Sequence, residues 1–263
     1  MATVNELRTY FETRVPTALK MDFDNVGLLV GTCDTTVHRT LVTLDITDDV
    51  IEEAIQGKVD LIVSHHPLFF DLKFVRDDDD TGRKIIRLLQ HGISAICLHT
   101  NLDAVEGGVN DALMQALGAK VTGLLSVDGT TPDGKPYGIS RVGELDAECA
   151  LDAFLFKVKS ALQANGLRYH DGGRAVKKLA VCGGSGGGDL PTVIAAGCDT
   201  FVTADIKYHQ FLMAKEHHIN LIDADHYATE QVVVPVLASL LQKQFPEIDT
   251  KLSATHKQTA QFY

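Results

Sequence analysis

The sequence contains no tryptophan and only five cysteines among its 263 residues. The cysteines are scattered and odd in number, and no two of them form a Cys-x-x-Cys motif. This spacing argues against a disulfide framework, which small oxidised domains build from regularly spaced, paired thiols. We therefore expect a reduced protein of the cell interior.

Long hydrophobic runs and a surplus of positive charge are also missing. The longest apolar stretch, residues 232–237, is too short to cross a bilayer, and residues 1–10 contain no apolar signal-peptide core. The formal net charge of -11 argues against general nucleic-acid binding and against docking on an anionic membrane, since both need excess Lys and Arg. We expect a cytoplasmic globular protein without a membrane partner.

Two adjacent histidines stand at the end of a short apolar strand. Residues 60–63 are expected to form a buried strand, and His65 and His66 follow it, immediately before Pro67. Consecutive side chains of a regular strand point to opposite faces, but Pro67 has no N–H and favours a turn here. Both imidazoles can then face one point and form half of a metal site. Ordinary turn histidines that only make hydrogen bonds are the alternative.

Predicted strands and helices alternate along the chain. This order favours an α/β protein with mainly parallel or mixed sheets covered by helices, whose binding crevice lies beyond the carboxyl ends of the strands. The histidine pair and residues 99–103 both follow such ends. The expected strands are 41–44, 60–63, 93–98, 141–145, 178–182, 199–203 and 219–223. The expected helices are 4–15, 48–56, 82–90, 109–117, 147–165, 206–217 and 226–244, with a further short helix that Asp189 caps and that has Pro191 in its first turn.

A polar stretch divides the chain. Residues 126–138 are rich in Asp, Gly, Thr and Pro, which makes them the best candidate for a boundary between lobes. We predict that residues 1–125 together with 222–263 form a lobe that carries the metal site, and that residues 126–221 form a second α/β lobe. The site would lie in the crevice between the lobes, and the whole chain would act as one functional unit.

His226 and Glu230 supply a second half-site. They are four residues apart on the last predicted helix, so both side chains project from one face, about 6 Å apart along the helix axis. An imidazole and a carboxylate with this spacing can reach one metal centre, and the same spacing also occurs in surface pairs. Joined to His65, His66 and Asp103, all at strand ends or helix starts, the set becomes much more specific.

Three imidazoles and two carboxylates suit two metal ions better than one. A mononuclear tetrahedral site does not need five ligands, whereas two ions about 3.5–4 Å apart with a bridging carboxylate do. Mixed nitrogen and oxygen ligands suit two divalent ions per protomer, and Zn, Fe, Mn, Co and Ni all fit them. His99 is either a sixth ligand or a residue that orients Asp103.

Six runs of the sequence match the motifs of a known family in their order. They are DNVGL at 24–28, SHHP at 64–67, HTNLD at 99–103, GGSG at 183–186, DIKYH at 205–209 and DADHYATE at 223–230. Together they resemble the Ngg-interacting-factor-three family, whose members are often named GTP cyclohydrolase type-one, type-two homologues. The resemblance covers essentially the whole chain.

This resemblance implies a two-lobed α/β protomer, a dinuclear metal centre, and a toroidal homohexamer with its sites facing an inner cavity. It also implies metal ligation by His65, His66, Asp103, His226 and Glu230, with Glu230 as the bridging carboxylate. Many members of the family carry an additional domain near the middle of the chain. The short polar boundary segment leaves no room for that domain here, so functions tied to it are not carried over.

The glycine turn at 183–188 admits other interpretations. Its Gly-x-Ser-x-Gly run fits a nucleophile elbow with Ser185 as the nucleophile, but three glycines separate Ser185 from the next predicted helix. A backbone nest for a phosphate or carboxylate and a tight strand-to-helix connection are the alternatives. Lys207, Tyr208 and His209 form either a solvated helix face or a group that binds substrate and transfers protons.

The leading hypothesis is a metal-dependent hydrolase acting on a small substrate that carries a nucleotide or phosphate group. A metal pair can lower the pKa of a bound water toward roughly 7 and polarise a carbonyl, imine or phosphoryl oxygen. In this hypothesis Glu230 holds the metals, and His99 or His209 transfers protons. The alternative is a non-catalytic metal-binding or scaffolding ring protein.

Overall fold

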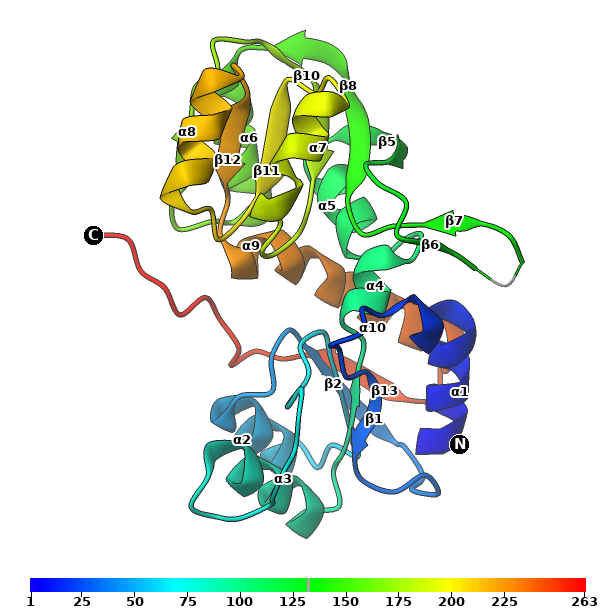
Figure 1. Cartoon of the computed structure of the whole chain (residues 1–263). Coiled ribbons are helices and arrows are strands. Elements are labelled where there is room, and N and C mark those ends of the chain that lie inside the picture. Colours follow the sequence, from blue (N-terminus) through cyan, green and yellow to red (C-terminus); the bar gives the residue numbers. More distant parts are fainter. Residues whose placement is uncertain (132) are drawn as a thin grey trace. The chain divides into compact units, whose positions relative to one another are not determined.

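The computed structural model describes residues 1–131 and 133–263, and the chain divides into two compact units (Figure 1). The first unit comprises residues 1–102 and 234–257, and the second comprises residues 103–233 and 258–263. Each unit combines one main sheet with helices, so the predicted α/β class is confirmed. None of the helices in the described ranges has the length and hydrophobicity that crossing a bilayer requires.

The first unit is built on a five-stranded mixed sheet. Its elements are strands β1 (Gly27–Val30), β2 (Arg39–Thr43), β3 (Leu61–Ser64), β4 (Ser94–Cys97) and β13 (Asp249–Leu252), and helices α1 (Val4–Arg14), η1 (Thr17–Leu19), α2 (Asp48–Gln56), α3 (Asp80–Gln90) and α10 (Val234–Gln244). The strand order is β1-β4-β3-β2-β13. β1 runs antiparallel to β4, and the other neighbours are parallel, so β2, β3 and β4 present their carboxyl ends at one edge.

Local sequence explains where the first helices begin. The Thr3 side chain accepts a hydrogen bond from the Glu6 backbone while the Glu6 side chain accepts one from Thr3, which is a capping box at the start of α1. Thr47 caps α2 in a similar way, and Gly57 ends that helix. Apolar side chains of α2 and α3 then pack on the sheet, and the core they form includes Leu41, Val50, Ile51, Ala54, Ile62, Ile85, Leu88 and Ala95.

The second unit is built on a six-stranded mixed sheet. Its elements are strands β5 (Ala119–Leu124), β8 (Arg141–Cys149), β9 (Arg168–His170), β10 (Val176–Val181), β11 (Thr200–Thr203) and β12 (Asn220–Asp223), and helices α5 (Val109–Ala116), α6 (Leu151–Leu162), η2 (Gly187–Asp189), α7 (Leu190–Ala195), α8 (Tyr208–Glu216), α9 (His226–Glu230) and η3 (Gln231–Val233). The order is β5-β8-β10-β11-β12-β9, and β10, β11 and β12 are parallel. Their carboxyl ends lead into the glycine turn, residue 204 and residue 224.

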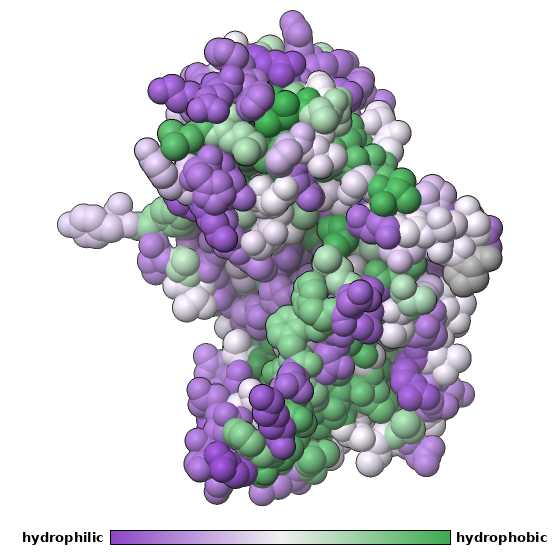
Figure 2. All heavy atoms as spheres, in the orientation of Figure 1, coloured by the Kyte–Doolittle hydropathy of each residue, from purple (hydrophilic) through white to green (hydrophobic). Residues whose placement is uncertain are grey.

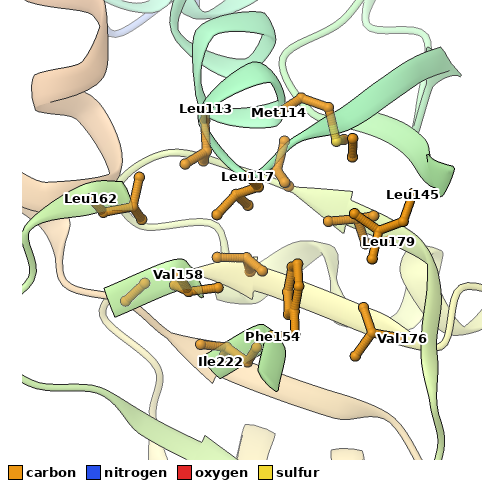
Figure 3. Packing of buried hydrophobic residues seen from close by; sticks show 14 of the residues in the cluster. Leu113, Met114, Leu117, Leu145, Phe154, Val158, Leu162, Val176, Leu179 and Ile222 are labelled. Atoms are coloured by element: carbon orange, nitrogen blue, oxygen red, sulfur yellow. The ribbon is translucent and has the colours of Figure 1, made fainter. Parts of the chain in front are cut away.

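A hydrophobic core covers one face of this second sheet (Figure 3). Leu113 and Leu117, from α5 and the residue after it, belong to the same cluster on this face as Phe154 and Val158 of α6. Phe154 is completely buried, and burying one such side chain contributes about 1.5–3 kcal/mol. The short helix α4 (Thr100–Ala104) joins the units, since its first residues belong to the first and its last two to the second.

The predicted lobes differ from the observed units in three segments, and one of them is residues 258–263, which belong to the second unit. Residues 103–125 and 222–233, which the prediction also placed in the metal-site lobe, belong to the second unit as well. The cause is strand pairing, because β5 pairs with β8 and β12 pairs with β11. The predicted boundary segment 126–138 contains a short hairpin of β6 (Gly129–Thr130) and β7 (Pro136–Tyr137), and its Pro132 lies outside the described residues.

The predicted helix 226–244 is wrong as a single helix, because the chain forms α9, η3 and α10 in its place. Pro235 is the second residue of α10 and has no N–H to continue an earlier helix, so a new helix begins around it. The predicted helix 147–165 begins too early, because Cys149 still pairs with Val176 in the sheet. Strands β5, β9 and β13 were not predicted. Most of their side chains are exposed or half-buried, so the alternation of apolar and polar residues is weak.

Candidate metal centre

The ends of β3 and β4 bring three histidines together in the first unit. These parallel strands are in register at Ser64 and Cys97, so the residues that follow them leave the sheet at one edge. His65 and His66 follow β3, and His99 follows β4. The ring centroids of His65 and His66 are 5.0 Å apart, and they lie 5.2 and 5.5 Å from that of His99. We call these three residues the histidine cluster.

The histidine cluster has the donors that a divalent transition metal prefers. Each of the three rings offers one nitrogen, and these three nitrogens all lie within 4.8 Å of one another. Imidazole nitrogen is a common ligand of Zn, Fe, Co and Ni, and His is the commonest metal ligand in proteins. The residues of the first unit therefore fit a metal ion, and His99 belongs to the group as closely as the two adjacent histidines do.

Oxygen acceptors orient all three rings of the histidine cluster. Nδ1 of His65 lies 2.8 Å from the main-chain oxygen of Leu98. Nδ1 of His66 lies 2.7 Å from Oδ1 of Asp45, and Nδ1 of His99 lies 2.8 Å from Oδ1 of Asp24. These oxygens can only accept, so Nδ1 carries the proton and Nε2 carries a lone pair, which can bind a metal or accept a proton.

The two orienting carboxylates are held ionised. Burial raises the pKa of Asp24, but hydrogen bonds from His99 and Thr100 outweigh this effect and lower the pKa to about 2. Burial also raises the pKa of Asp45, but hydrogen bonds from His256 and His66 outweigh it, so the pKa lies below its usual value. Asp24 also receives the backbone N–H of Thr100 at 2.9 Å and so anchors the start of α4. These contacts place Asp24 beside the histidine cluster.

Aromatic side chains adjoin the histidine cluster. The ring of Phe70 lies 5.7 Å from that of His99 and 6.0 Å from that of Phe23, and both phenylalanines are more than half exposed. Asn25, the other motif residue of this region, donates from its side chain to the main-chain oxygen of Phe69 at 3.1 Å. Figure 2 shows hydrophobic side chains, in green, gathered on the visible face of the first unit.

The second unit holds His226 and Glu230 together. Both belong to α9, and Nε2 of His226 lies 3.1 Å from Oε2 of Glu230, as their i and i+4 spacing predicted. Nδ1 of His226 lies 2.7 Å from Oδ2 of Asp205, so this ring is oriented as the histidine cluster is. Asp205 and the helix cap Asp225 have φ angles of 54° and 75°, a region that non-glycine residues seldom occupy. One of these residues contacts the His226 ring and the other directly precedes it, and unusual backbone angles of this kind cluster at functional sites.

The charges around His226 set its protonation. Burial lowers the pKa of His226, but hydrogen bonds and charge attraction from Glu230 and Asp205 outweigh this effect and raise the pKa to about 9. The imidazole is therefore protonated at neutral pH when no metal is bound. A metal ion that binds Nε2 must displace that proton.

The glycine turn packs against Glu230. The N–H of Gly184 donates to Oγ1 of Thr229 at 3.0 Å, and Gly184 has a φ of +63°. A β-carbon on Gly184 would overlap Oε1 of Glu230 and stand 3.1 Å from Cε1 of His226. Glycine is required here both for the left-handed angle and for the close approach. Ser185 is exposed, and the strained position of the turn belongs to Gly184, so the turn does not have the geometry of a nucleophile elbow.

Asn110 links the glycine turn to Asp103. Its completely buried amide accepts the N–H of Gly183 at 2.8 Å and donates to the main-chain oxygen of Asp103 at 3.4 Å. Asp103 itself is 8% exposed and Glu230 is 4% exposed. Burial raises the pKa of the neighbouring Cys182 thiol, and the negative charges of Asp189, Asp103 and Glu230 add to the increase. The second unit thus gathers Asp103, His226 and Glu230 around the glycine turn.

The remaining predicted residues lie at the start of α8. Lys207 is the cap of α8, and its backbone N–H donates to Oε1 of Gln210 at 2.7 Å. Tyr208 is 77% exposed, and His209 is also exposed on the first turn. This exposure fits a solvated helix face, and it also leaves the three side chains accessible to a substrate.

Sequence reasoning missed Asp45 and His256 and gave Asp205 no role of its own. Asp45 stands just beyond the carboxyl end of β2, a position where a polar residue in an α/β sheet often faces a site, and that signal could have found it. His256 has no comparable signal, because only the packing of residues 253–257 on the first unit brings it to Asp45, 2.9 Å away.

The chain is similar to known proteins over nearly its whole length. A family model described as Duf34/NIF3 (NGG1p interacting factor 3) matches residues 2–260. A Clostridium acetobutylicum protein named GTP cyclohydrolase 1 type 2 homolog is 35% identical over 241 residues, which cover 91% of this chain and 89% of the relative. A Clostridium perfringens protein of the same name is 35% identical over 249 residues, which cover 94% of this chain and 93% of the relative.

Solved structures resemble the chain over its whole length. The crystal structure of the Staphylococcus aureus hypothetical protein SA1388 superimposes with a TM-score of 0.91 at 32% identity. The match covers 99% of this chain and 99% of that one. The fold described above is therefore that of an experimentally determined relative.

Proposed function

Because the chain belongs to the Duf34/NIF3 family, we propose that it is a metal-dependent hydrolase of a small substrate. The proposed centre contains two divalent ions, chosen from Zn, Fe, Mn, Co and Ni. The residues that would hold these ions are His65, His66, Asp103, His226 and Glu230, with the Glu230 carboxylate as the proposed bridging ligand.

The shared orientation of four imidazoles is the observation that carries the proposal. Nδ1 of His65, His66, His99 and His226 each lies 2.7–2.8 Å from a main-chain or carboxylate oxygen. Histidine ligands of metals are held in this way almost without exception, because the acceptor sets the tautomer and raises the basicity of Nε2. Histidines that merely occupy turns need no such acceptors on the same nitrogen of every ring.

The donor set suits hydrolysis. Two divalent ions would lower the pKa of a coordinated water toward about 7 and polarise a carbonyl, imine or phosphoryl oxygen of the substrate. Glu230 is almost fully buried, which excludes bulk water from its carboxylate. His99, whose Nδ1 lies 2.8 Å from Oδ1 of Asp24, is the first proposed proton-transfer residue. His209 is the second proposed proton-transfer residue.

The substrate we propose is small and contains a planar ring or a phosphate group. The name of the clostridial relatives suggests ring opening of a purine nucleotide, and phosphoester or amide hydrolysis uses the same chemistry. The exposed ring of Phe70, 5.7 Å from that of His99, supports a planar substrate, since aromatic rings stack on planar heterocycles. The net charge of -11 disfavours long nucleic acids as substrates.

We also propose that the protein forms a toroidal homohexamer in the cytoplasm, on the strength of the family resemblance. Light scattering of the purified protein measures this directly. A mass near six times 28.5 kDa is expected. A stable monomer at micromolar concentration would refute the ring.

Metal content tests the proposed ligands. Glu230→Ala removes the bridging carboxylate and is expected to abolish bound metal, whereas Glu216→Ala, an exposed residue at the end of α8, should retain it. Elemental analysis of protein purified without added metal gives the element and its stoichiometry for both variants. Full metal content in Glu230→Ala would refute the assignment.

A substrate panel then separates a hydrolase from a scaffold. Metal-loaded wild-type protein is offered purine nucleotides, phosphoesters and amides, with metal-stripped protein as the control. Turnover above the control on one class supports the hydrolase. If no class of substrate is turned over, the result favours a metal-binding or scaffolding protein over a hydrolase.

A further inference from the structure

Residues 253–258 follow β13 and belong to neither a helix nor a strand. We call them the 253–258 segment; Figure 1 shows them in red, after β13. Glu53 of α2 anchors the beginning of the segment in the first unit. Its carboxylate accepts the Ser253 hydroxyl at 2.6 Å, the N–H of Ala254 at 2.9 Å and the Thr255 hydroxyl at 2.8 Å. Several charge-assisted bonds to one carboxylate hold the segment in a defined path.

The path brings His256 to the carboxylate that orients a proposed metal ligand. Nε2 of His256 lies 2.9 Å from Oδ2 of Asp45, while Oδ1 of Asp45 lies 2.7 Å from Nδ1 of His66. The His256 side chain is only 9% exposed. One carboxylate is therefore held between two imidazoles, one from the 253–258 segment and one from the histidine cluster.

The end of the segment makes an equivalent contact in the second unit. Nε2 of Gln258 donates to Oδ1 of Asp225, the residue that caps α9. The same Asp225 oxygen accepts the N–H of Ala228 at 3.2 Å. Residue 258 belongs to the second unit, whereas residues 253–257 belong to the first. The segment thus contacts one carboxylate behind His66 and one behind the helix that carries His226 and Glu230.

We propose that the 253–258 segment positions the metal ligands of both units, His256 through Asp45 and Gln258 through Asp225. This inference depends on the proposed function for the identity of the ligands. An aspartate with one donor can rotate about its side-chain bonds, whereas a second donor on its other oxygen fixes the carboxylate plane. His66 then presents Nε2 in one direction. Residues that directly orient a metal ligand, as Asp45 orients His66, are worth 10- to 100-fold in metal affinity, and His256 acts through Asp45.

Metal affinity of single variants tests His256. His256→Ala removes the second donor to Asp45, His256→Gln retains a donor amide, and Lys257→Ala changes an exposed neighbour in the same segment. Zn²⁺ affinity is measured by competition with a chelator, and the visible spectrum of Co²⁺-loaded protein reports ligand geometry. We expect His256→Ala to weaken Zn²⁺ binding about 10-fold or more and to alter the Co²⁺ spectrum. His256→Gln should recover most of the affinity, and Lys257→Ala should match wild type.

The melting temperature of the metal-free protein separates positioning from folding. We expect His256→Ala to shift it by less than about 4 °C, the change that roughly 1 kcal/mol produces in a chain of this size. Wild-type affinity in His256→Ala would overturn the inference. A loss of affinity that glutamine does not restore would also overturn it, because His256 would then be a ligand or a folding residue.

Gln258→Ala tests the second contact by the same measurements, and an affinity equal to that of wild type would limit the inference to His256. The outcomes also distinguish this inference from the function on which it depends. Wild-type protein that binds no Zn²⁺ or Co²⁺ overturns both. Wild-type protein that binds metal, together with an unchanged His256→Ala variant, overturns only the positioning role.

Discussion

Gly184 packs directly against the carboxylate of Glu230. A methyl group at this α-carbon would overlap Oε1 of Glu230, and the Gly184 φ of +63° is itself unfavourable for other residues. The N–H of Gly184 also donates to Thr229, the residue before Glu230 in α9. The glycine turn therefore acts as a support that holds the proposed bridging carboxylate in place.

Replacing Gly184 should remove bound metal. In Gly184→Ala the new methyl group displaces Glu230, and the left-handed backbone angle adds about 1 kcal/mol of strain. We expect a loss of metal content measured by elemental analysis, together with a lower melting temperature. Gly188→Ala is the matched control, because a β-carbon there would meet nothing within 4 Å. Equal metal content in the two variants would contradict the supporting role of Gly184.

Replacing Asn110 should weaken metal binding as well as destabilise the fold. Asn110→Ala leaves the N–H of Gly183 without its acceptor, which costs about 1–3 kcal/mol in a buried position. The link between Asp103 and the glycine turn is lost as well, so metal affinity should fall together with the free energy of unfolding. Gln115→Ala on the exposed side of α5 should change stability by less than about 0.5 kcal/mol. Unchanged metal affinity in Asn110→Ala would exclude the link.

The stability of the metal-free protein should depend on Asp24 in acid. The pKa of Asp24 is about 2 in the folded chain against a usual value of 3.8, so its ionised form stabilises the fold. The contribution is about 2 kcal/mol above pH 4 and is lost as the pH falls through about 2. Urea unfolding of wild type and Asp24→Asn should differ by this amount at pH 7 and converge near pH 2. A pH-independent difference would show that Asp24 acts through packing alone.

Metal binding should release a proton from His226. Its pKa of about 9 in the metal-free chain means that the ring is charged at pH 7, and a metal at Nε2 requires the neutral ring. Calorimetry in two buffers with different ionisation enthalpies should give about one proton released from this residue at pH 7, decreasing above pH 9. The apparent affinity for the metal should rise as the pH increases from 7 to about 9, because the proton on His226 then competes less with the metal. Asp205→Asn should move the release profile to lower pH, since Asp205 helps to raise this pKa.

Several parts of the structure followed from local patterns. The apolar runs before His65 and His99 predicted two buried strands, and the structure places both residues just beyond parallel strands. The spacing of His226 and Glu230 predicted that both side chains lie on one face of a helix, and Nε2 of His226 lies 3.1 Å from Oε2 of Glu230. These predictions succeeded because strand burial and helix periodicity act over a few residues and leave a direct trace in the sequence.

Other features depended on contacts between distant segments. The exposed edge strands, the break in the last predicted helix and the boundaries of the two units all differ from the sequence-based expectation. Asp45 shows the same limit at the site, because its link to His66 joins residues 21 positions apart through the packing of two strands. No pattern in the neighbouring sequence identifies a carboxylate that orients a metal ligand.

The sequence by itself determined the chemical inventory: which residues bear imidazoles and carboxylates, and that they stand where buried strands end or a helix begins. Only the tertiary structure decided which oxygen each ring contacts, why glycine occupies position 184, and that His256 reaches Asp45. Periodicity arises from the local geometry of the backbone. Orientation arises from hydrogen bonds between side chains that meet only after the sheets have formed.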